Sequence, residues 1–274
     1  MTELSAAHAA AVTDRSRLAG SAYSSDRDLA ARQSLYRWQT PRYDLPGIIA
    51  EKLNGVRVHG RVVDVGCGNG KFVQRLRDDR PDLALLGLDI APGILAGVPG
   101  LVAVADVTRL PLATEGVDAA LALHMLYHVP DIPQAVRELS RVVTPDGLVI
   151  ASTNSERDKA ELDDLWQRAA GDILGTGRGP ARISLSARFS LEKASAFLGE
   201  EFERVETTEL PGTITVRDPG PVVAHMASYR AWADQHDVPF DATVERARTI
   251  LVEHIDRHGT FEITCLGGVL VCRR

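Results

Sequence analysis

The residues best placed to do chemistry lie in one short stretch, residues 61–70, which reads Arg-Val-Val-Asp-Val-Gly-Cys-Gly-Asn-Gly. The β-branched run before the glycines predicts a buried strand, and residues 71–78, with their apolar positions on one face, predict a helix. Glycines at alternate positions give the turn access to positive φ and let a ligand approach the backbone closely. The stretch therefore predicts a nucleotide-sized cradle at the carboxyl end of a parallel sheet.

Two acids set the kind of ligand that this cradle would hold. Asp64 stands two residues before the first glycine, where a carboxylate would repel a phosphate but suits a cationic amino group. The next apolar run, residues 83–88, predicts a strand that ends in Asp89, placed to accept both hydroxyls of a ribose. The spacing Gly66-x-Gly68-x-Gly70 also differs from the Gly-x-Gly-x-x-Gly of dinucleotide-binding turns. A nucleoside carrying a positive charge is the expected ligand.

Five segments, in this order and spacing, resemble the class I S-adenosylmethionine-dependent methyltransferases. Besides the glycine turn and the strand ending in Asp89, they are residues 102–107, 117–129 and 139–153. Asp146 departs from the family pattern, which usually has a second glycine there. The resemblance covers roughly residues 45–155. It implies S-adenosylmethionine as the cofactor, with Asp106 near the adenine amino group, and it assigns binding to these residues: Asp64, Gly66, Cys67, Gly68, Gly70, Asp89, Ile90, Asp106, Val107, Leu123 and Tyr36.

The resemblance also implies a fold. We expect an α/β protein with a doubly wound, Rossmann-like sheet of seven strands, the last of them antiparallel. Residues 1–44 would form an N-terminal tail and aromatic cap, residues 45–155 the cofactor-binding core, and residues 156–274 the rest of the sheet with helical lid insertions. Within the last part the apolar patterns predict helices at 156–173, 190–198, 218–236 and 242–258, and strands at 203–210 and 261–272. Gly267 and Gly268 suggest a bulge in the closing strand.

Candidate catalytic residues follow the fourth strand, where the acceptor would meet the methyl group. They are His124, Tyr127 and His128. A histidine has a pKa suited to a base near neutrality, so either one could remove a proton from the acceptor. The plainer interpretation is that the three residues only line or wall the pocket. No Cys or acid lies near the histidines at metal-ligand spacing, so we expect no metal site.

Four aromatic residues crowd into the stretch before the core: Tyr23, Tyr36, Trp38 and Tyr43. As a cap they could close over the sulfonium, because aromatic faces attract cations. Alternatively, they only pack the first helix. By the same resemblance, Arg32 and Arg37 are candidates to hold the carboxylate of the methionine moiety.

Other candidates lie in the lid region and have plainer alternatives. His225, Tyr229 and Trp232 fall on one helical face, which could project into a substrate cavity or simply face the core. A group of arginines could bind an acidic substrate or be solvated surface charges: Arg178, Arg182 and Arg188.

Composition limits the partners. The chain of 274 residues has 37 acidic and 31 Lys or Arg residues, which gives a net charge of −6. This negative charge disfavours binding to the phosphate backbone of nucleic acids. No apolar run approaches the roughly 20 residues of a membrane span, and the N-terminus does not resemble a signal peptide. The three cysteines suggest neither disulfides nor a metal site. We expect a cytoplasmic protein whose partner is a small molecule; monomer and homodimer both stay open.

The sequence thus predicts a methyltransferase that acts on O, N or C of a small molecule, such as a secondary metabolite. Two other functions stay open. One keeps the cofactor but performs other chemistry, such as cyclisation or elimination, and the other is RNA methylation. The fourth strand lacks the Asn/Asp-Pro-Pro-Tyr motif of many nucleic-acid amino-methylating enzymes, which disfavours the RNA alternative.

Overall fold

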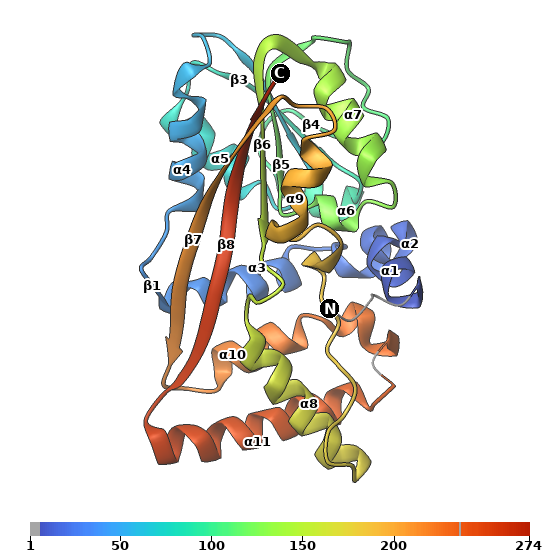
Figure 1. The fold of residues 1–274 in the computed structure, drawn as a ribbon, viewed down its shortest axis with the longest axis vertical. Coiled ribbons are helices and arrows are strands. Elements are labelled where there is room, and N and C mark those ends of the chain that lie inside the picture. The colour runs from blue at the N-terminus through green and yellow to red at the C-terminus, as the bar shows by residue number, and fades with distance from the viewer. Residues whose placement is uncertain (1–5, 236) are drawn as a thin grey trace.

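The computed structural model describes residues 6–235 and 237–274. Its centre is one sheet in the order β1-β7-β8-β6-β5-β2-β3-β4 (Figure 1). The strands are β1 Gln39–Thr40, β2 Arg61–Val65, β3 Ala84–Asp89, β4 Val102–Val104, β5 Val117–Leu123, β6 Val143–Asn154, β7 Arg204–Val216 and β8 Phe261–Arg273.

The strand directions confirm the predicted doubly wound sheet. Strands β4, β3, β2, β5 and β6 run parallel to one another, whereas β8 runs antiparallel to both β6 and β7. The chain crosses from β4 back over the sheet to β5, so the strand order reverses between β2 and β5. This switch point is where open α/β sheets bind ligands. The two-residue edge strand β1 adds an eighth strand to the seven predicted.

Apolar helices cover both faces of the core sheet. One face packs against α4 Leu45–Lys52, α5 Lys71–Asp79 and α6 Pro92–Leu95. The other packs against α7 Ile132–Val142 and α9 Leu191–Leu198. Strands buried on both faces explain the continuous apolar runs from which they were predicted. Short helical turns complete this part: η3 Leu53–Gly55, η4 Leu126–His128 and η5 Ser186–Arg188.

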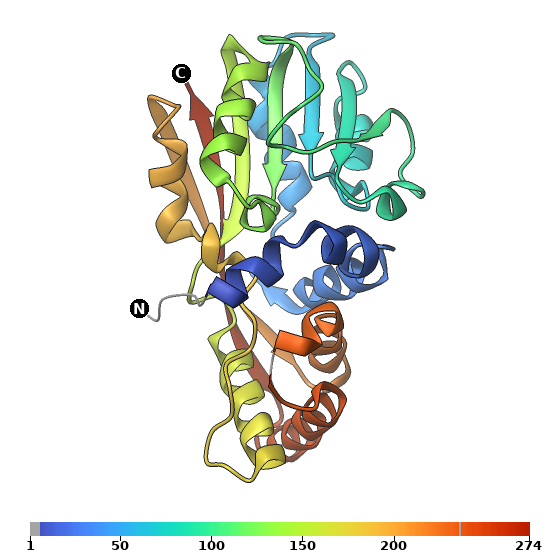
Figure 2. The same cartoon turned by 90° about the vertical axis from the view of Figure 1, so that its right-hand side faces the viewer.

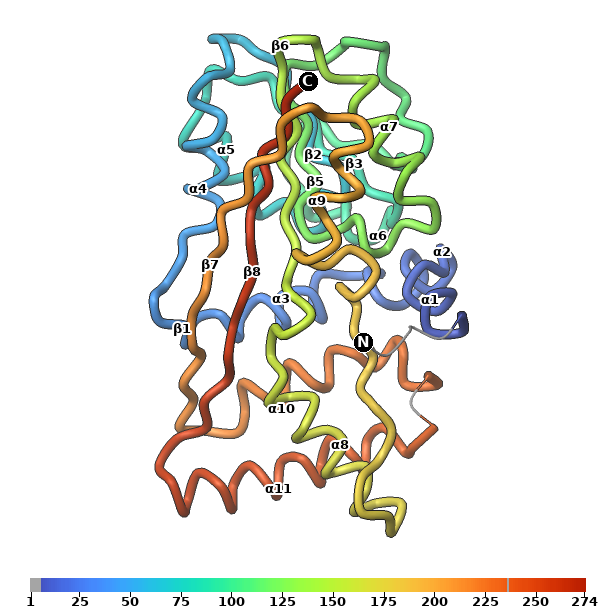
Figure 3. Tube along the Cα trace, in the orientation of Figure 1, coloured from blue at the N-terminus to red at the C-terminus, as the bar shows by residue number. Residues whose placement is uncertain are grey.

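Strands β7 and β8 form a long antiparallel pair that joins the core to a second, helical layer (Figure 3). One half of β8 pairs with β6, and the other half packs with the lid helices around a separate apolar cluster. These helices are α8 Ala160–Leu174, α10 Gly220–Ala227 and α11 Phe240–His258, with the turn η6 Arg230–Gln235. The β7–β8 pair thus connects the lid helices to the sheet.

Two sequence predictions about strands β7 and β8 are wrong. Strand β7 extends to Val216 rather than ending near residue 210, because its second half buries Ile214 and Val216 against the lid. The predicted bulge is absent, since the β7–β8 pairing runs without a register shift. A Cβ at Gly268 would come within 2.6 Å of Leu191 on α9, so this glycine permits close packing of a helix instead.

The N-terminal segment lies between the core sheet and the lid helices (Figure 2). It forms α1 Ala6–Thr13, α2 Arg15–Arg17, the π-helical turn η1 Leu18–Ala22, α3 Arg27–Ser34 and η2 Leu35–Trp38. The sequence predicts an N-terminal tail at the start of this segment, but the part of it that the structure describes is packed. Val12 and Leu18 are buried with Ile183, Leu185 and Trp232 from the lid side. Residues 1–5 lie outside the described residues.

Two lid helices also differ from the predictions. Helix α8 begins at Ala160, not at residue 156, because Lys159 has a φ of 62° and the Asp158 carboxylate accepts a hydrogen bond from Leu266 N–H at 3.0 Å. The helix predicted at 218–236 is broken between α10 and η6, and His236 lies outside the described residues. No helix in the described parts of the chain is long and apolar enough to cross a membrane.

Candidate active site

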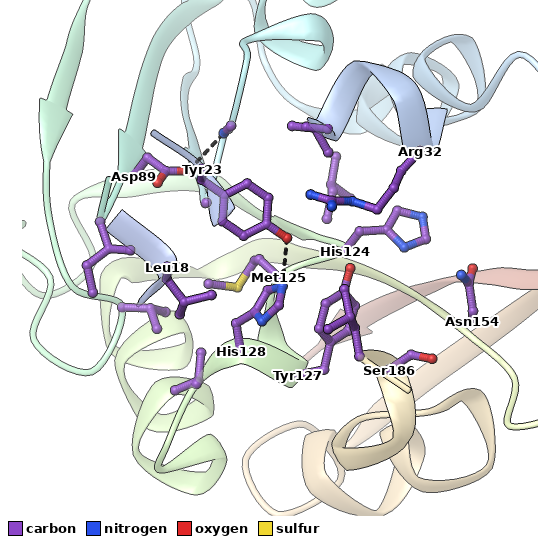
Figure 4. A pocket seen from close by; sticks show the side chains of 18 of the residues that line it. Leu18, Tyr23, Arg32, Asp89, His124, Met125, Tyr127, His128, Asn154 and Ser186 are labelled. Atoms are coloured by element: carbon purple, nitrogen blue, oxygen red, sulfur yellow. Dashed lines mark hydrogen bonds between the residues drawn. The ribbon is translucent and has the colours of Figure 1, made fainter. Parts of the chain in front are cut away.

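A cavity of about 620 Å³ lies between the core sheet, the N-terminal helices and the lid. This volume is within the range of ligand-binding sites, ~300–1,000 Å³. All three parts of the chain contribute to its wall, including the turns after β2, β3 and β5 at the carboxyl end of the sheet. Figure 4 shows Tyr23, Tyr127 and His128 gathered around this space, with Asp89 on one side and Asn154 on the other.

The glycine turn between β2 and α5 has the open backbone that the sequence predicts. Gly66 has a φ of 74°, and a Cβ there would come within 2.7 Å of Met125. Gly68 has a φ of 55°, and its N–H donates to Asp89 Oδ2 at 2.9 Å. The other oxygen of Asp89 accepts from Ala91 N–H at 2.9 Å. These bonds fix the carboxylate at the cavity wall, where each oxygen keeps a further lone pair for a ligand hydroxyl.

Asp64 is buried beneath this turn and does not form part of the cavity wall. It is 3% exposed, and neither carboxylate oxygen has a hydrogen-bond partner among the described residues. Burial raises the pKa of its carboxyl to about 7, and the nearby Asp89 carboxylate adds to the rise. A buried acid without a partner is costly when ionised, so a cationic ligand group close to the turn would relieve this cost.

The Asp64 carboxyl gives a pH-dependent stability prediction. The folded protein holds this proton until about pH 7, whereas the unfolded chain releases it near pH 4, so this group lowers stability as pH rises from about 4 to 7. We expect Asp64→Asn to gain stability relative to wild type by on the order of 4 kcal/mol between pH 4 and pH 8. Urea unfolding of both proteins at the two pH values measures this. An equal stability difference at both pH values would contradict the buried, unpaired carboxylate.

Asp106 and Val107 lie at the far end of the same sheet edge. The Asp106 carboxylate accepts from Thr108 N–H at 2.9 Å and pairs with Arg15 at 3.0 Å. Arg15 comes from the N-terminal helices. This ion pair therefore links the N-terminal segment to the core at the wall of the cavity. Val107 is buried, and Ile90 is beside Asp89 on the same wall.

His124 has an unusual backbone for a histidine. It follows β5 with a φ of 54°, and its N–H donates to Ser152 O at 3.0 Å. Positive φ costs a non-glycine residue roughly 1–2 kcal/mol, and such strain is often found at functional sites. Burial lowers the pKa of the imidazole to about 4, with the charge of Lys159 contributing. His124 is therefore neutral at pH 7 and has a ring nitrogen able to accept a proton.

His128 has both ring nitrogens occupied. Nδ1 lies 2.8 Å from Val12 O, and Nε2 lies 2.8 Å from the Tyr23 hydroxyl (Figure 4). Because a carbonyl only accepts, Nδ1 carries the proton and Nε2 accepts from Tyr23. The ring also stacks on Trp232 with centroids 6.2 Å apart. Burial lowers its pKa to about 4, so His128 is a neutral link between the N-terminal segment and the core.

Two tyrosines complete this part of the wall. Tyr127 packs edge-on against His128, and burial raises its pKa well above the usual value. Tyr36 accepts a hydrogen bond from Lys159 Nζ at 2.7 Å, and the Lys159 ammonium also pairs with Asp158 at 2.5 Å. Burial raises the pKa of Tyr36 to about 12. Both hydroxyls are protonated at neutral pH and can donate or accept a hydrogen bond, but neither is a base.

The comparisons with known proteins agree with this geometry. Residues 63–151 match the model of a family described as a methyltransferase domain. The match begins in β2 and ends in β6, so it spans the glycine turn, the strand ending in Asp89 and the turn that carries His124. This part of the chain is therefore similar to a methyltransferase domain, as the resemblance to the class I S-adenosylmethionine-dependent enzymes predicts.

Several curated proteins are similar to the methyltransferase core. The malonyl-[acyl-carrier protein] O-methyltransferase of Hahella chejuensis is 31% identical over 117 residues, 40% of this chain and 42% of that protein. The enzyme of the same name from Halorhodospira halophila is 30% identical over 165 residues, 54% of this chain and 55% of that protein. The chain therefore spans about half the length of the curated relatives it matches.

Solved structures share the fold of this chain. A protein from Anabaena variabilis, described as a putative methyltransferase from an antibiotic biosynthesis pathway, aligns with a TM-score of 0.60, 15% identity and coverage of 82% of this chain and 95% of that one. The [4+2]-cyclase SpnF aligns with a TM-score of 0.50, 19% identity and coverage of 84% and 80%. At these identities the likeness concerns the fold alone.

Most of the site residues predicted from the sequence surround the cavity. Its wall includes all three candidate catalytic residues and nine of the predicted cofactor residues: Tyr36, Gly66, Cys67, Gly68, Asp89, Ile90, Asp106, Val107 and Leu123. Asp64 and Gly70 stand behind the wall. Gly70, with a φ of 73°, begins α5, and a Cβ there would come within 2.5 Å of Val98. Its role in the structure is to let the turn pack.

The aromatic and basic candidates divide between wall and surface. Tyr23 and Arg32 line the cavity, whereas Trp38, Tyr43 and Arg37 do not. Of the lid arginines, Arg182 lines the cavity, Arg178 is exposed and pairs with Asp164, and Arg188 binds backbone carbonyls of residues 127–130. His225 and Tyr229 face the cavity, and Trp232 is buried behind them.

The sequence interpretation missed Arg15, Leu18 and Lys159, which also line the cavity. Arg15 and Leu18 lie in a segment without clear apolar periodicity, so nothing in the pattern placed them at the site. Lys159 was expected inside a helix, and only its left-handed backbone turns it inward. The three cysteines are free and buried, and the described residues contain no group of three or more His, Cys, Asp or Glu arranged to hold a metal.

Proposed function

We propose that this protein transfers the methyl group of S-adenosylmethionine to an oxygen of a small-molecule acceptor. The observation that carries the proposal is the Asp89 carboxylate, held at the cavity wall by Gly68 and Ala91 N–H groups directly beside an open glycine turn. A carboxylate in this place suits a ribose diol and would repel a pyrophosphate. The methyltransferase family match over the same residues supports this choice.

The described residues fit the cofactor at both ends. At one end, the unpartnered Asp64 carboxylate lies under the turn and would be stabilised by the ammonium of the methionine moiety. At the other, Asp106 and Val107 are available to the adenine ring. We propose that residues 45–155 hold the cofactor, and that residues 1–44 and 156–274 enclose the acceptor. The family's cofactor, when bound, supplies an electrophilic methyl group and its own leaving group.

The protein's own contribution would be alignment, exclusion of water and removal of one proton. Tyr23 and Tyr127, on the wall of the cavity, would limit the positions open to the acceptor. His124 would accept the proton of the acceptor hydroxyl, because its imidazole is neutral above pH 4. His128 is a weaker candidate, since both its nitrogens are already hydrogen-bonded. We propose oxygen as the acceptor atom because the curated relatives with the core in common include O-methyltransferases.

Mass spectrometry tests the proposed function. The protein is incubated with S-adenosylmethionine and a panel of small hydroxy and carboxylic acids, and both products are followed. The expected result is one acceptor that gains one methyl group, in step with the release of S-adenosylhomocysteine. An acceptor that is rearranged without gaining mass, while the cofactor stays intact, would overturn methyl transfer in favour of cyclisation. Methyl gain by RNA alone would overturn the small-molecule acceptor.

A further inference from the structure

The lid end of the cavity contains more positive charge than its own acids neutralise. Three buried cations line it, Arg32, Arg182 and Lys159. Lys159 pairs with Asp158, and Arg182 pairs with Asp163 at 2.9 Å. None of the ion pairs among the described residues involves Arg32.

Arg32 is held by neutral groups only. It is 9% exposed, and its Nη1 donates to Ser228 O at 2.8 Å. Its guanidinium carbon lies 5.3 Å from the ring centroid of Tyr23 and 5.9 Å from that of Trp232. Its Nη2 is buried and has no hydrogen-bond partner among the described residues. Since an ionised guanidinium is costly to bury with an unused donor, this nitrogen needs an acceptor from outside the chain.

Arg182 repeats this arrangement from the opposite element. Its side chain is 8% exposed and its Nε donates to Asp163, while its Nη1 is buried and makes no hydrogen bond within residues 6–235 and 237–274. Its guanidinium carbon lies 5.0 Å from the ring centroid of Tyr229, and that of Arg32 lies 5.7 Å from the same centroid. Two buried arginines therefore stand over one aromatic ring, each with a free donor.

His225 completes the group. It is 3% exposed and lines the cavity, and neither ring nitrogen has a hydrogen-bond partner in the part of the chain that the structure describes. Burial lowers its pKa well below the usual value, and the charges of Lys159, Arg182 and Arg32 add to this effect. A neutral imidazole carries one N–H, so His225 offers a third donor in a positive environment.

We propose that the acceptor carries an anionic group, a carboxylate or one of similar size, which Arg182 and Arg32 hold at the lid end while His225 donates a further hydrogen bond. This inference rests on the proposed function for the identity of the acceptor. Arginine pairs with carboxylates through two parallel hydrogen bonds, which fix the direction of the bound molecule as well as its charge. An anion anchored here would present the remainder of the acceptor toward His124.

The cofactor's own carboxylate is the other source of an anion, and Arg182 separates the two. Arg182, Tyr229 and His225 belong to residues 156–274, whereas the residues assigned to the cofactor lie mostly between 64 and 123. A site for the methionine carboxylate would not need donors from the lid. We therefore expect Arg182 to affect acceptor binding alone, whereas Arg32, which belongs to the N-terminal cap, should affect the binding of both acceptor and cofactor.

Calorimetry on the full chain tests this proposal with succinate as the anionic probe and succinamide as its neutral match. Wild-type protein saturated with S-adenosylhomocysteine is expected to bind succinate and not succinamide. Arg182→Gln should weaken succinate binding at least about tenfold, the loss of one charged hydrogen bond, and change S-adenosylhomocysteine affinity less than twofold. Arg178→Gln is the matched control, because Arg178 is on the same loop but is exposed and paired with Asp164. It should change neither affinity.

Three results would overturn the anion site. They are the absence of succinate binding to wild type at millimolar concentration, equal binding of succinamide, and equal losses of succinate and S-adenosylhomocysteine affinity in Arg182→Gln. The last result would assign the arginine to the cofactor. If Arg182→Gln does not fold, Arg182→Lys is used instead. It keeps the positive charge but loses the two parallel donors of the guanidinium, and it should weaken succinate binding several-fold. If wild type does not bind S-adenosylhomocysteine, the proposed function is contradicted. The anion site is then tested separately, by measuring succinate binding to the protein without cofactor.

Discussion

Asp89→Ala is expected to weaken binding of S-adenosylhomocysteine by about 10²-fold or more. The carboxylate would accept two hydrogen bonds from the ribose diol, and a hydrogen bond to a charged group contributes roughly 1.5–3 kcal/mol. The same substitution removes the acceptors of Gly68 and Ala91 N–H, so the glycine turn also loses its support. Calorimetric titration of the purified variant with S-adenosylhomocysteine measures the loss.

Two further variants make this result specific. Asp89→Asn keeps one oxygen and the shape of the side chain, so it should fall between wild type and Asp89→Ala. Asp79→Ala removes an exposed acid from the end of α5 that only pairs with Arg75, and it should bind like wild type. If Asp89→Ala bound S-adenosylhomocysteine with wild-type affinity while remaining folded, the ribose assignment would be wrong.

His124→Asn is expected to lower the methyl-transfer rate by roughly 10²-fold, within the usual range for loss of a general base, with cofactor affinity unchanged. Asparagine is the preferred replacement because it tolerates positive φ better than alanine, and His124 has a φ of 54°. His124→Ala should show the same loss of turnover together with some loss of stability. The rate is measured with the acceptor found by mass spectrometry, and cofactor affinity is measured by calorimetry.

The pH profile checks the same role. Since burial lowers the pKa of His124 to about 4, the base is unprotonated at neutral pH, and wild-type turnover should not fall through this group until the pH approaches 4. His258→Ala is the control, because that histidine is exposed on α11, far along the chain from the turn after β5. A variant at His124 that kept wild-type turnover would reduce His124 to a wall residue and point instead to an acceptor that has no proton to lose.

The core of this protein is readable from its sequence because each part of it has a local signal. The β-branched run before Gly66, the alternating glycines and the acid at the end of β3 are consecutive in the chain, and parallel strands bring their carboxyl ends to one edge. The alignment of these core strands can therefore be predicted with few errors. The cavity wall includes Gly66, Gly68 and Asp89 as predicted.

The rest of the site depends on contacts between distant segments, which have no local signal. Arg32 is hydrogen-bonded to Ser228, which is 196 positions away in the sequence. The hydroxyl of Tyr23 is hydrogen-bonded to His128, which is 105 positions away. Arg182 was one of three arginines that the sequence could not tell apart, because burial by the lid alone distinguishes it from Arg178. The long antiparallel β7–β8 pair connects the lid to the core, and the second half of β7 packs its apolar residues against the lid, which no local turn signal predicts.

The central claim is that the glycine turn and Asp89 hold S-adenosylmethionine, and isothermal titration of the wild-type protein with that compound tests it most directly. The predicted result is a single site per chain that S-adenosylhomocysteine competes for and NAD does not. An absence of binding, or tighter binding of NAD than of S-adenosylmethionine, would contradict the claim.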